Sequence, residues 1–210
     1  MTSPLLYISQ PPHTANIRLA CEAGCRAVQL RVKNAQPQEW LQLAKEAKAV
    51  CDTFGVALYI NDNPHLAKQV GATGVHLGLN DMSVAEARKI LGPDVIIGGT
   101  ANTATDIRRH ASEGADYIGL GPFRFTTTKE QLSPTLGLDG YHRVLEQAAV
   151  RLPVFAIGGI LEDDVPGLKA AGIYGVAVSG LITYAEDRTG LVARLLRQLD
   201  QPVHQHLPKN

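Results

Sequence analysis

The sequence predicts a single α/β domain folded as a (β/α)8 TIM barrel, because short apolar runs alternate with amphipathic helix patterns along nearly all of its 210 residues. Eight such runs occur, each of a length that suits a strand buried on both faces. A doubly wound open sheet seldom needs eight strands at this length, and no glycine-rich dinucleotide-binding turn follows the first run. We expect residues 1–200 to form this one catalytic domain and the polar segment 201–210 to be a disordered tail.

The predicted strands are short runs of aliphatic and β-branched residues. They are Leu5–Ile8, Ala27–Leu30, Val56–Ile60, Gly74–Leu77, Val95–Ile97, Tyr117–Leu120, Val154–Ile157 and Gly175–Val178. Turn-forming residues lie between them, such as the Asn63-Pro64 pair after the third run. The regular return of such runs after each helical pattern is what a parallel sheet with crossover helices requires.

The clearest predicted helix is Pro37–Phe54, in which apolar residues from Trp40 to Val50 recur at three- and four-residue spacing. Proline also suits the first helical turn, where its missing N–H costs nothing. The other predicted helices are Thr14–Gly24, Asn63–Gly71, Ser83–Gly92, Thr103–Gly114, Asp139–Val150, Glu162–Gly172 and Asp187–Leu199. Glycine at 24, 71, 114 and 172 predicts four of the helix ends.

Composition and charge exclude several classes of function. Hydrophobic residues make up 45% of the chain and charged residues 19%, and 20 basic side chains balance 20 acidic ones. A nucleic-acid-binding or membrane-surface protein would usually carry a net basic face, so we expect neither partner. No apolar run approaches the ~18 residues that span a bilayer, and Met1–Gln10 lacks the basic start of a signal peptide. The sequence is compatible with a homo-oligomer as well as with a monomer.

The cysteines and the scattered histidines are not expected to do chemistry. Cys21, Cys25 and Cys51 lack zinc-site spacing, and we interpret them as buried small residues in a reducing cytoplasm. Four histidines are interpreted as structural or surface residues, because they are spread over predicted helices and one strand: His65, His76, His110 and His142.

Polar residues gather where the predicted strands end, which is the face that barrels of this kind use for chemistry. Each alone is more often a surface pair, a helix N-cap or a turn, but together they predict one shared site. The strand ends carry Arg31 and Lys33, Asn61-Asp62, Asn80-Asp81, Gly98–Asn102, Thr126–Lys129, Gly158-Gly159 and Val178-Ser179.

The residue types at this rim predict phosphate chemistry. Asp62 and Asp81 follow adjacent strands without a ligand-spaced Cys or His, which favours a hard cation held by oxygen, Mg²⁺. Arg31, Lys33 and Lys129 would neutralise the phosphate oxygens that the metal leaves bare. Gly159 and Val178-Ser179 follow the seventh and eighth strands, where barrels commonly bind a phosphate through backbone N–H groups. One diphosphate and one monophosphate substrate are therefore expected, with pyrophosphate leaving the first before the second attacks.

From about Leu5 to Leu199 the chain resembles the thiamine phosphate synthase (thiamine-phosphate pyrophosphorylase) family. The resemblance rests on many ordered matches. They are Gln29–Lys33, Ile60–Asp62, Gly74–Gly78, Asn80–Met82, Ile97–Thr100, Gly114–Gly119, Gly121-Pro122, Thr126–Lys129, Ala156–Ile160 and Gly175–Ser179.

The resemblance implies a cytoplasmic, Mg²⁺-dependent transferase of thiamine biosynthesis. Such an enzyme joins hydroxymethylpyrimidine diphosphate to thiazole phosphate, giving thiamine phosphate and pyrophosphate by a dissociative substitution without a protein nucleophile. It implies diphosphate binding by Gln29, Leu30, Arg31, Val32, Lys33, Asn61, Thr100 and Lys129, with Arg31, Lys33 and Lys129 catalytic. It further implies metal binding by Asp62 and Asp81, and thiazole phosphate binding by Thr126, Thr127, Thr128, Gly159, Val178 and Ser179.

The chain departs from the family pattern at three places. Thr100 stands where the family usually has serine, which keeps the hydroxyl, and Asn102 stands where histidine is frequent. Arg124-Phe125 replaces a common Phe-Pro before the threonine-rich segment, where the arginine either adds a phosphate contact or faces solvent.

Two other functions are weighed against the synthase. A related thiazole tautomerase must move a proton, and in that sister group a histidine stands where this chain has Pro122. A non-catalytic barrel that binds a phosphorylated ligand would need neither paired metal carboxylates nor diphosphate cations. Both alternatives are therefore less well matched than the synthase.

Overall fold

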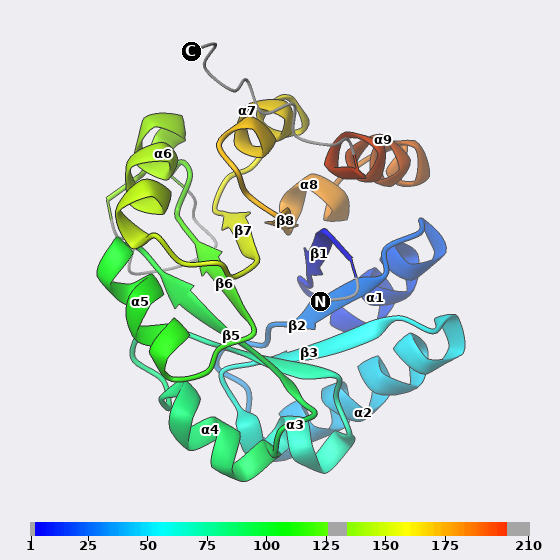
Figure 1. Ribbon diagram of the computed structural model, residues 1–210. Helices are drawn as coiled ribbons and strands as arrows, with labels where there is room; N and C mark the ends of the chain where they lie inside the picture. The colour runs from blue at the N-terminus through cyan, green and yellow to red at the C-terminus, as the bar shows by residue number, and fades with distance from the viewer. Residues whose placement is uncertain (1–2, 126–133, 201–210) are drawn as a thin grey trace, which may run out of the picture.

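Eight parallel strands close into a barrel in which each strand pairs with the next along the chain and β8 pairs with β1. This computed structural model describes residues 3–125 and 134–200. In Figure 1 the strands form an inner ring and the helices lie around it. The strands are β1 (Leu5–Ile8), β2 (Ala27–Leu30), β3 (Ala57–Asn61), β4 (Gly74–Leu77), β5 (Ile96–Ala101), β6 (Tyr117–Leu120), β7 (Val154–Ile157) and β8 (Gly175–Val178). The predicted (β/α)8 fold is confirmed.

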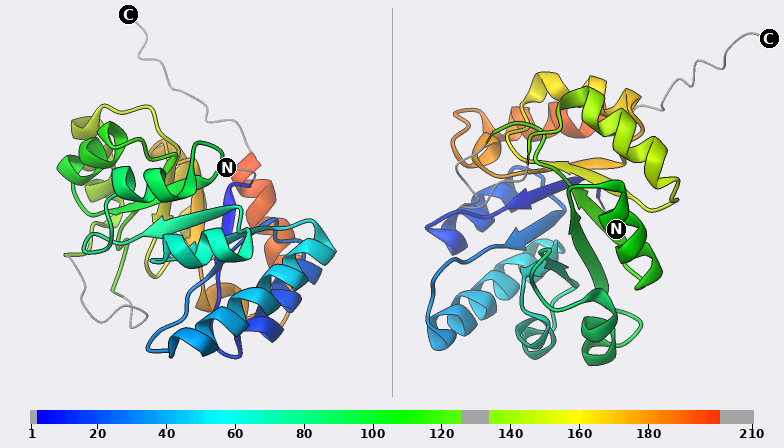
Figure 2. Two further views of the ribbon diagram at one scale, coloured as in Figure 1. Left: turned by 90° about the horizontal axis from the view of Figure 1, so that it is seen from below. Right: turned by 90° about the vertical axis from the view of Figure 1, so that its left-hand side faces the viewer.

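Helices follow the strands and cover the outside of the barrel, as two further views show (Figure 2). They are α1 (His13–Glu22), α2 (Pro37–Phe54), α3 (Pro64–Val70), α4 (Val84–Leu91), α5 (Ala104–Ser112), α6 (Gly137–Ala148), α7 (Val165–Ala170), α8 (Gly180–Thr183) and α9 (Arg188–Asp200). A 3-10 turn, Glu162–Asp164, precedes α7, so the helix predicted at Glu162–Gly172 is shorter than expected. The one-turn helix α8 was not predicted, because four residues carry no helical periodicity.

Two strands differ from their predicted bounds. β3 covers Ala57–Asn61 instead of Val56–Ile60, and β5 runs to Ala101 instead of ending at Ile97. The prediction stopped β5 early because Gly98 and Gly99 lower strand propensity. The barrel needs a glycine at 98, since an added Cβ would lie 2.1 Å from the Tyr117 ring.

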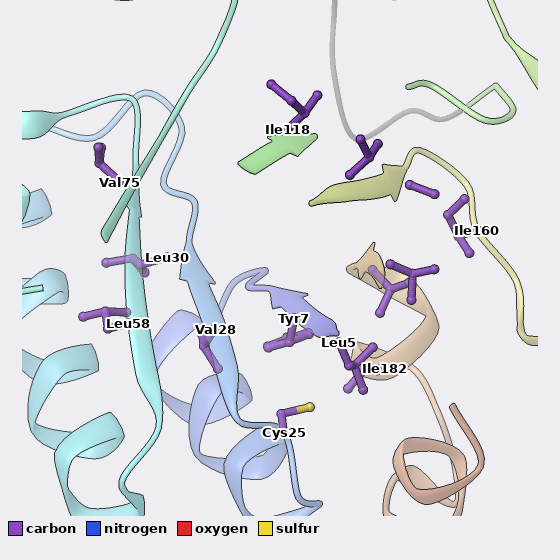
Figure 3. Packing of buried hydrophobic residues seen from close by; sticks show 14 of the residues in the cluster. Leu5, Tyr7, Cys25, Val28, Leu30, Leu58, Val75, Ile118, Ile160 and Ile182 are labelled. Carbon is purple, nitrogen blue, oxygen red and sulfur yellow. The ribbon is translucent and has the colours of Figure 1, made fainter. Parts of the chain in front are cut away.

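Because successive side chains of a strand point to opposite faces of the sheet, the apolar residues form two layers, one outside and one inside the barrel. Residues such as Val28, Leu30 and Leu58 point outward into the large core between sheet and helices, part of which is shown in Figure 3. Residues such as Tyr59 and Tyr117 point into the barrel, where they form a smaller cluster with Leu6, Ile8, Ala27, Phe155 and Ala177. This inner cluster closes the bottom of the barrel and leaves the upper lumen to the polar side chains at the strand ends.

The cysteines lie in the outer layer, as expected of small buried residues. Cys21, Cys25 and Cys51 are all buried and form no disulfide. Burial raises the pKa of the Cys25 thiol to about 12, which keeps it protonated and unreactive. No helix within the described ranges is long and apolar enough to cross a membrane.

Candidate active site

A cavity of about 600 Å³ opens at the carboxyl ends of the strands. Its wall takes residues from the ends of all eight strands or the turns after them, so the rim predicted from the sequence is one continuous site. Nine of the predicted site residues line it: Gln29, Arg31, Asn61, Asp62, Asp81, Thr100, Gly159, Val178 and Ser179. A volume of this size is typical of a small-molecule binding site.

Other predicted site residues lie elsewhere. The Leu30 side chain is fully buried in the outer core, and Val32 packs against that core, so only their backbones face the rim. Lys33 lines a second cavity of about 510 Å³, which shares Arg31 with the first. Thr126, Thr127, Thr128 and Lys129 lie outside the described residues.

The carboxylates of Asp62 and Asp81 come together around Gly78. A Cβ added at Gly78 would lie 2.7 Å from Asp81 Oδ2 and 3.9 Å from Asp62 Oδ1, so the missing side chain makes room for both. The backbone N–H of Gly78 donates to Asp81 Oδ2 at 2.6 Å and fixes that carboxylate. This arrangement gathers negative charge at one place on the rim.

Asp62 reaches the cavity through an unusual backbone conformation. Neighbouring residues of a strand point to opposite faces, yet both Asn61 and Asp62 line the cavity. Asp62 has φ of 62°, in the left-handed region, and its N–H donates to the His76 carbonyl at 2.8 Å. Aspartate and asparagine tolerate this conformation better than most residues. The turn therefore redirects the carboxylate toward Asp81.

Gln29 and Asn61 form a buried amide pair on the neighbouring strands β2 and β3. Gln29 Nε2 donates to Asn61 Oδ1 at 3.2 Å, and both side chains are buried at the lumen. A buried amide has capacity for several hydrogen bonds, and this pair uses one donor and one acceptor. Both amides therefore keep hydrogen-bonding capacity for polar atoms of a ligand.

The Ser179 hydroxyl is engaged by the protein. It donates to the Ile8 carbonyl at 2.7 Å and accepts from Gln10 Nε2 at 2.9 Å. Gln10 is held in turn by Tyr184, whose hydroxyl donates to Gln10 Oε1 at 2.7 Å. Contacts of Ser179 with a ligand would therefore use its backbone N–H and not its hydroxyl.

The Arg124 side chain is partly exposed and is held by an acidic partner. It forms a bidentate ion pair with Asp164 and donates from Nη1 to the Gly159 carbonyl at 2.6 Å. The sequence pattern did not reveal this acidic partner, which lies 40 residues away along the chain. The side chain packs over Gly159, where an added Cβ would lie 2.4 Å from Arg124 Cγ.

His76 is a cavity residue that the sequence interpretation missed. It is buried, lines the cavity, and approaches the Thr100 hydroxyl through Nε2 at 3.0 Å. The signal was present in the strand alternation, because Gly74, His76 and Gly78 share the lumen face of β4 and its extension. By contrast, His65 and His142 are exposed, and His110 is buried behind β5, where Nε2 lies 2.8 Å from the Thr100 carbonyl.

Asn102 and Pro122 also line the cavity. The Asn102 side-chain amide donates to the Gly121 carbonyl and so ties the end of β5 to the end of β6. Neither side chain titrates near neutral pH. Among the described residues, neither Asn102 nor Pro122 is therefore suited to moving a proton.

Comparisons with known proteins agree with this fold. Residues 8–182 match the family model for thiamine monophosphate synthase. The chain is 47% identical to the thiamine-phosphate synthase of Flavobacterium psychrophilum, over 95% of this chain and 100% of that protein. It is 48% identical to the thiamine-phosphate synthase of Bacteroides fragilis, over 85% of this chain and 89% of that protein. Among solved structures, the thiamine phosphate pyrophosphorylase of Pyrococcus furiosus superposes with a TM-score of 0.81 at 30% identity, covering 93% and 94% of the two chains.

Proposed function

Because the chain belongs to the thiamine monophosphate synthase family, we propose that it joins hydroxymethylpyrimidine diphosphate to thiazole phosphate, with release of pyrophosphate. It is a transferase of thiamine biosynthesis. The observation that carries the substrate assignment is the pairing of Asp62 with Asp81 in the same cavity as Arg31 and the Gly158-Gly159 turn. The charged subsite suits a metal-bound diphosphate, and the glycine turn suits a monophosphate.

The donor set at Asp62 and Asp81 fits Mg²⁺. No group of three or more His, Cys, Asp or Glu side chains suited to a metal gathers within residues 3–125 and 134–200, so two carboxylates are the protein's contribution there. Mg²⁺ is usually bound through one or two carboxylates, with water and substrate phosphates completing its octahedron. When bound, the ion would neutralise charge on the diphosphate. Asp62 and Asp81 would hold it, and the Gly78 N–H would keep Asp81 in place.

Cationic side chains would act on the leaving group. Arg31 lies between the two cavities and Lys33 lines the second, so both can reach a diphosphate that extends from one to the other. We assign the same role to Lys129, which lies outside the described residues. Fixed cations that meet developing charge on pyrophosphate stabilise the transition state more than the ground state.

The bond-forming step would need positioning and no protein base. The thiazole nitrogen already carries a lone pair, and holding it against the pyrimidine methylene makes its attack effectively intramolecular. Backbone N–H groups of Gly159, Val178 and Ser179 are the proposed anchors of the thiazole phosphate. The apolar side chains of Ile8 and Ile157 would exclude water from the reactive cation.

The wall around Pro122 supports a synthase over a tautomerase. A tautomerase needs a titrating group at the thiazole ring, and both nitrogens of His76 are already engaged by Tyr117 and Thr100. The test is to incubate the purified protein with both substrates and Mg²⁺ and to detect thiamine phosphate. Isomerisation of thiazole carboxylate phosphate without coupling would overturn the proposal.

We also propose a cytoplasmic location for this reaction. The buried, unpaired thiols of Cys21, Cys25 and Cys51 suit a reducing compartment. Fractionation of the native cell, followed by immunodetection, would check it, and recovery from an oxidising compartment would contradict it.

A further inference from the structure

His76 links two hydroxyl groups across the upper lumen of the barrel. Its Nδ1 lies 3.0 Å from the Tyr117 hydroxyl and its Nε2 lies 3.0 Å from Thr100 Oγ1. The ring is seated closely, because a Cβ added at Gly119 would lie 2.9 Å from His76 Cε1. The ring centroids of His76 and Tyr117 are 5.5 Å apart with a tilt of 33°. The imidazole therefore has one orientation, with Nδ1 toward the barrel floor and Nε2 toward the cavity.

Tyr117 determines which nitrogen of His76 carries the proton. Tyr117 is buried below the cavity, and burial raises the pKa of its hydroxyl well above the ordinary value, so the hydroxyl keeps its proton. Within the part of the chain that the structure describes, His76 Nδ1 is the acceptor placed to receive that proton. A neutral imidazole that accepts at Nδ1 must be protonated at Nε2.

The direction of the next hydrogen bond follows. With Nε2 protonated, His76 donates to Thr100 Oγ1, and the hydroxyl oxygen is the acceptor. The backbone of Thr100 is fixed separately, because its carbonyl lies 2.8 Å from His110 Nε2. No second hydrogen-bond partner of Thr100 Oγ1 lies among the described residues, and Thr100 lines the cavity. The hydroxyl proton of Thr100 therefore points to the cavity.

We propose that His76 is a positioning residue that fixes the Thr100 hydroxyl as a hydrogen-bond donor to a diphosphate oxygen. This inference rests on the proposed function, since it assumes that a diphosphate occupies the cavity. Without the imidazole, the Thr100 proton would be free to turn toward protein acceptors and would have to be reoriented when the anion binds. The Tyr117–His76–Thr100 chain thus prepares a neutral donor next to the cations of the same site.

The first test reads the proton position directly. Two-bond ¹H–¹⁵N correlation spectra of the ¹⁵N-histidine-labelled protein should show His76 protonated at Nε2 and unprotonated at Nδ1, and Tyr117→Phe should alter that assignment. His76→Gln identifies the signal. A His76 protonated at Nδ1 in the wild type would contradict the proposal, whether or not the protein forms thiamine phosphate.

The second test asks whether the effect of His76 on ligand binding depends on the Thr100 hydroxyl. Calorimetry measures the affinity of each variant for inorganic pyrophosphate in the presence of Mg²⁺. His76→Leu should weaken pyrophosphate binding by about tenfold, the usual effect of losing one hydrogen bond to a charged acceptor. His76→Gln places an amide N–H near the position of Nε2 and should restore most of the affinity. In a Thr100→Val background, His76→Leu should have no further effect, because the hydroxyl it orients is gone.

The results distinguish the role of His76 from the assignment of the diphosphate site. Equal effects of His76→Leu with and without the Thr100 hydroxyl would show that His76 acts structurally, and would overturn the proposal while leaving the synthase assignment intact. Failure of the wild-type protein to bind pyrophosphate with Mg²⁺ would contradict the diphosphate site itself and, with it, the proposed function. Circular dichroism of each variant checks that the barrel is folded.

Discussion

Arg124 and Asp164 form a bidentate ion pair across the mouth of the barrel, with Nη1 2.5 Å from Oδ2 and Nη2 3.0 Å from Oδ1. The pair joins the segment after β6 to the turn before α7, and the same guanidinium donates to the Gly159 carbonyl. Asp164 also accepts from the Leu161 N–H at 2.7 Å. Two loops that border the proposed thiazole phosphate subsite are therefore fastened to one another.

This pair predicts a pH-dependent contribution to stability. Burial alone would raise the pKa of Asp164, but hydrogen bonds from Arg124 and from the Leu161 N–H outweigh it and hold the pKa below its ordinary value. A lowered carboxyl pKa contributes stability above the unfolded-state value of about 4, and that stability is lost as the pH falls through the folded-state value. Asp164→Asn should therefore lower the free energy of unfolding at pH 7 by about 1 kcal/mol or less, since Arg124 is partly exposed.

Urea titrations of the wild type and of Asp164→Asn at pH 7 and near pH 3 check this. The difference between the two proteins should shrink at the lower pH. A constant difference would show that the ionised carboxylate is not what stabilises the loop. Lys48→Gln, which removes an exposed ion pair on α2, is the matched control and should change stability little at either pH.

Asp62 offers a way to separate charge from backbone conformation. Asp62→Asn removes the charge but keeps a residue that tolerates φ of 62°, whereas Asp62→Ala loses both. Both variants should lose turnover and require more Mg²⁺, but only the alanine variant should also lose thermal stability. Initial rates against Mg²⁺ concentration, together with melting curves, test this. Full activity of Asp62→Asn would remove this residue from the proposed metal site.

Gly78→Ala should weaken Mg²⁺ binding without removing a ligand. The new Cβ would lie 2.7 Å from Asp81 Oδ2, which forces that carboxylate out of its place beside Asp62. The Mg²⁺ concentration for half-maximal rate should rise by about tenfold or more if each displaced charge contact is worth over 1.4 kcal/mol. Gly167→Ala, whose Cβ would meet only Leu138 at 3.4 Å, is the control. An unchanged Mg²⁺ requirement in Gly78→Ala would contradict the paired-carboxylate site.

Arg31 and Lys129 should speed bond formation itself and not only substrate binding. Loss of a group that stabilises developing charge costs about 2.7–4 kcal/mol in barrier where it behaves as an oxyanion donor. Arg31→Gln and Lys129→Ala should therefore slow single-turnover formation of the carbon–nitrogen bond by a factor on the order of 100 to 1,000. Rapid-quench measurements with enzyme in excess give this rate. A wild-type rate with a raised KM alone would make these residues binding groups and nothing more.

Much of the barrel could be predicted because buried parallel strands and their crossover helices leave a regular sequence pattern. The eight predicted strands lie at or within a few residues of β1 to β8, and the error at β5 arose where Gly98 serves the packing of Tyr117. Strand alternation would also have excluded the side chains of Leu30 and Val32 from the rim. The resemblance alone implies the whole Gln29–Lys33 segment and does not distinguish its two faces.

Other parts of the site depend on contacts between residues far apart in sequence. The ion pair of Arg124 with Asp164 and the clamp on Ser179 by Gln10 join loops that no local pattern connects. The left-handed turn at Asp62 is likewise set by its hydrogen bond to the His76 carbonyl on the next strand. The sequence predicts only a structural or surface role for His76, because a single histidine in a strand does not reveal what lies on either side of its ring.

We propose that the enzyme transfers the pyrimidinylmethyl group from the diphosphate to the thiazole nitrogen, with release of pyrophosphate. The most direct measurement is a time course of pyrophosphate and thiamine phosphate in one reaction of the purified protein with both substrates and Mg²⁺. We expect the two products to appear in equal amounts and at equal rates, and EDTA to stop both. Failure of thiamine phosphate to form, or its continued formation after EDTA has removed the metal, would contradict this assignment.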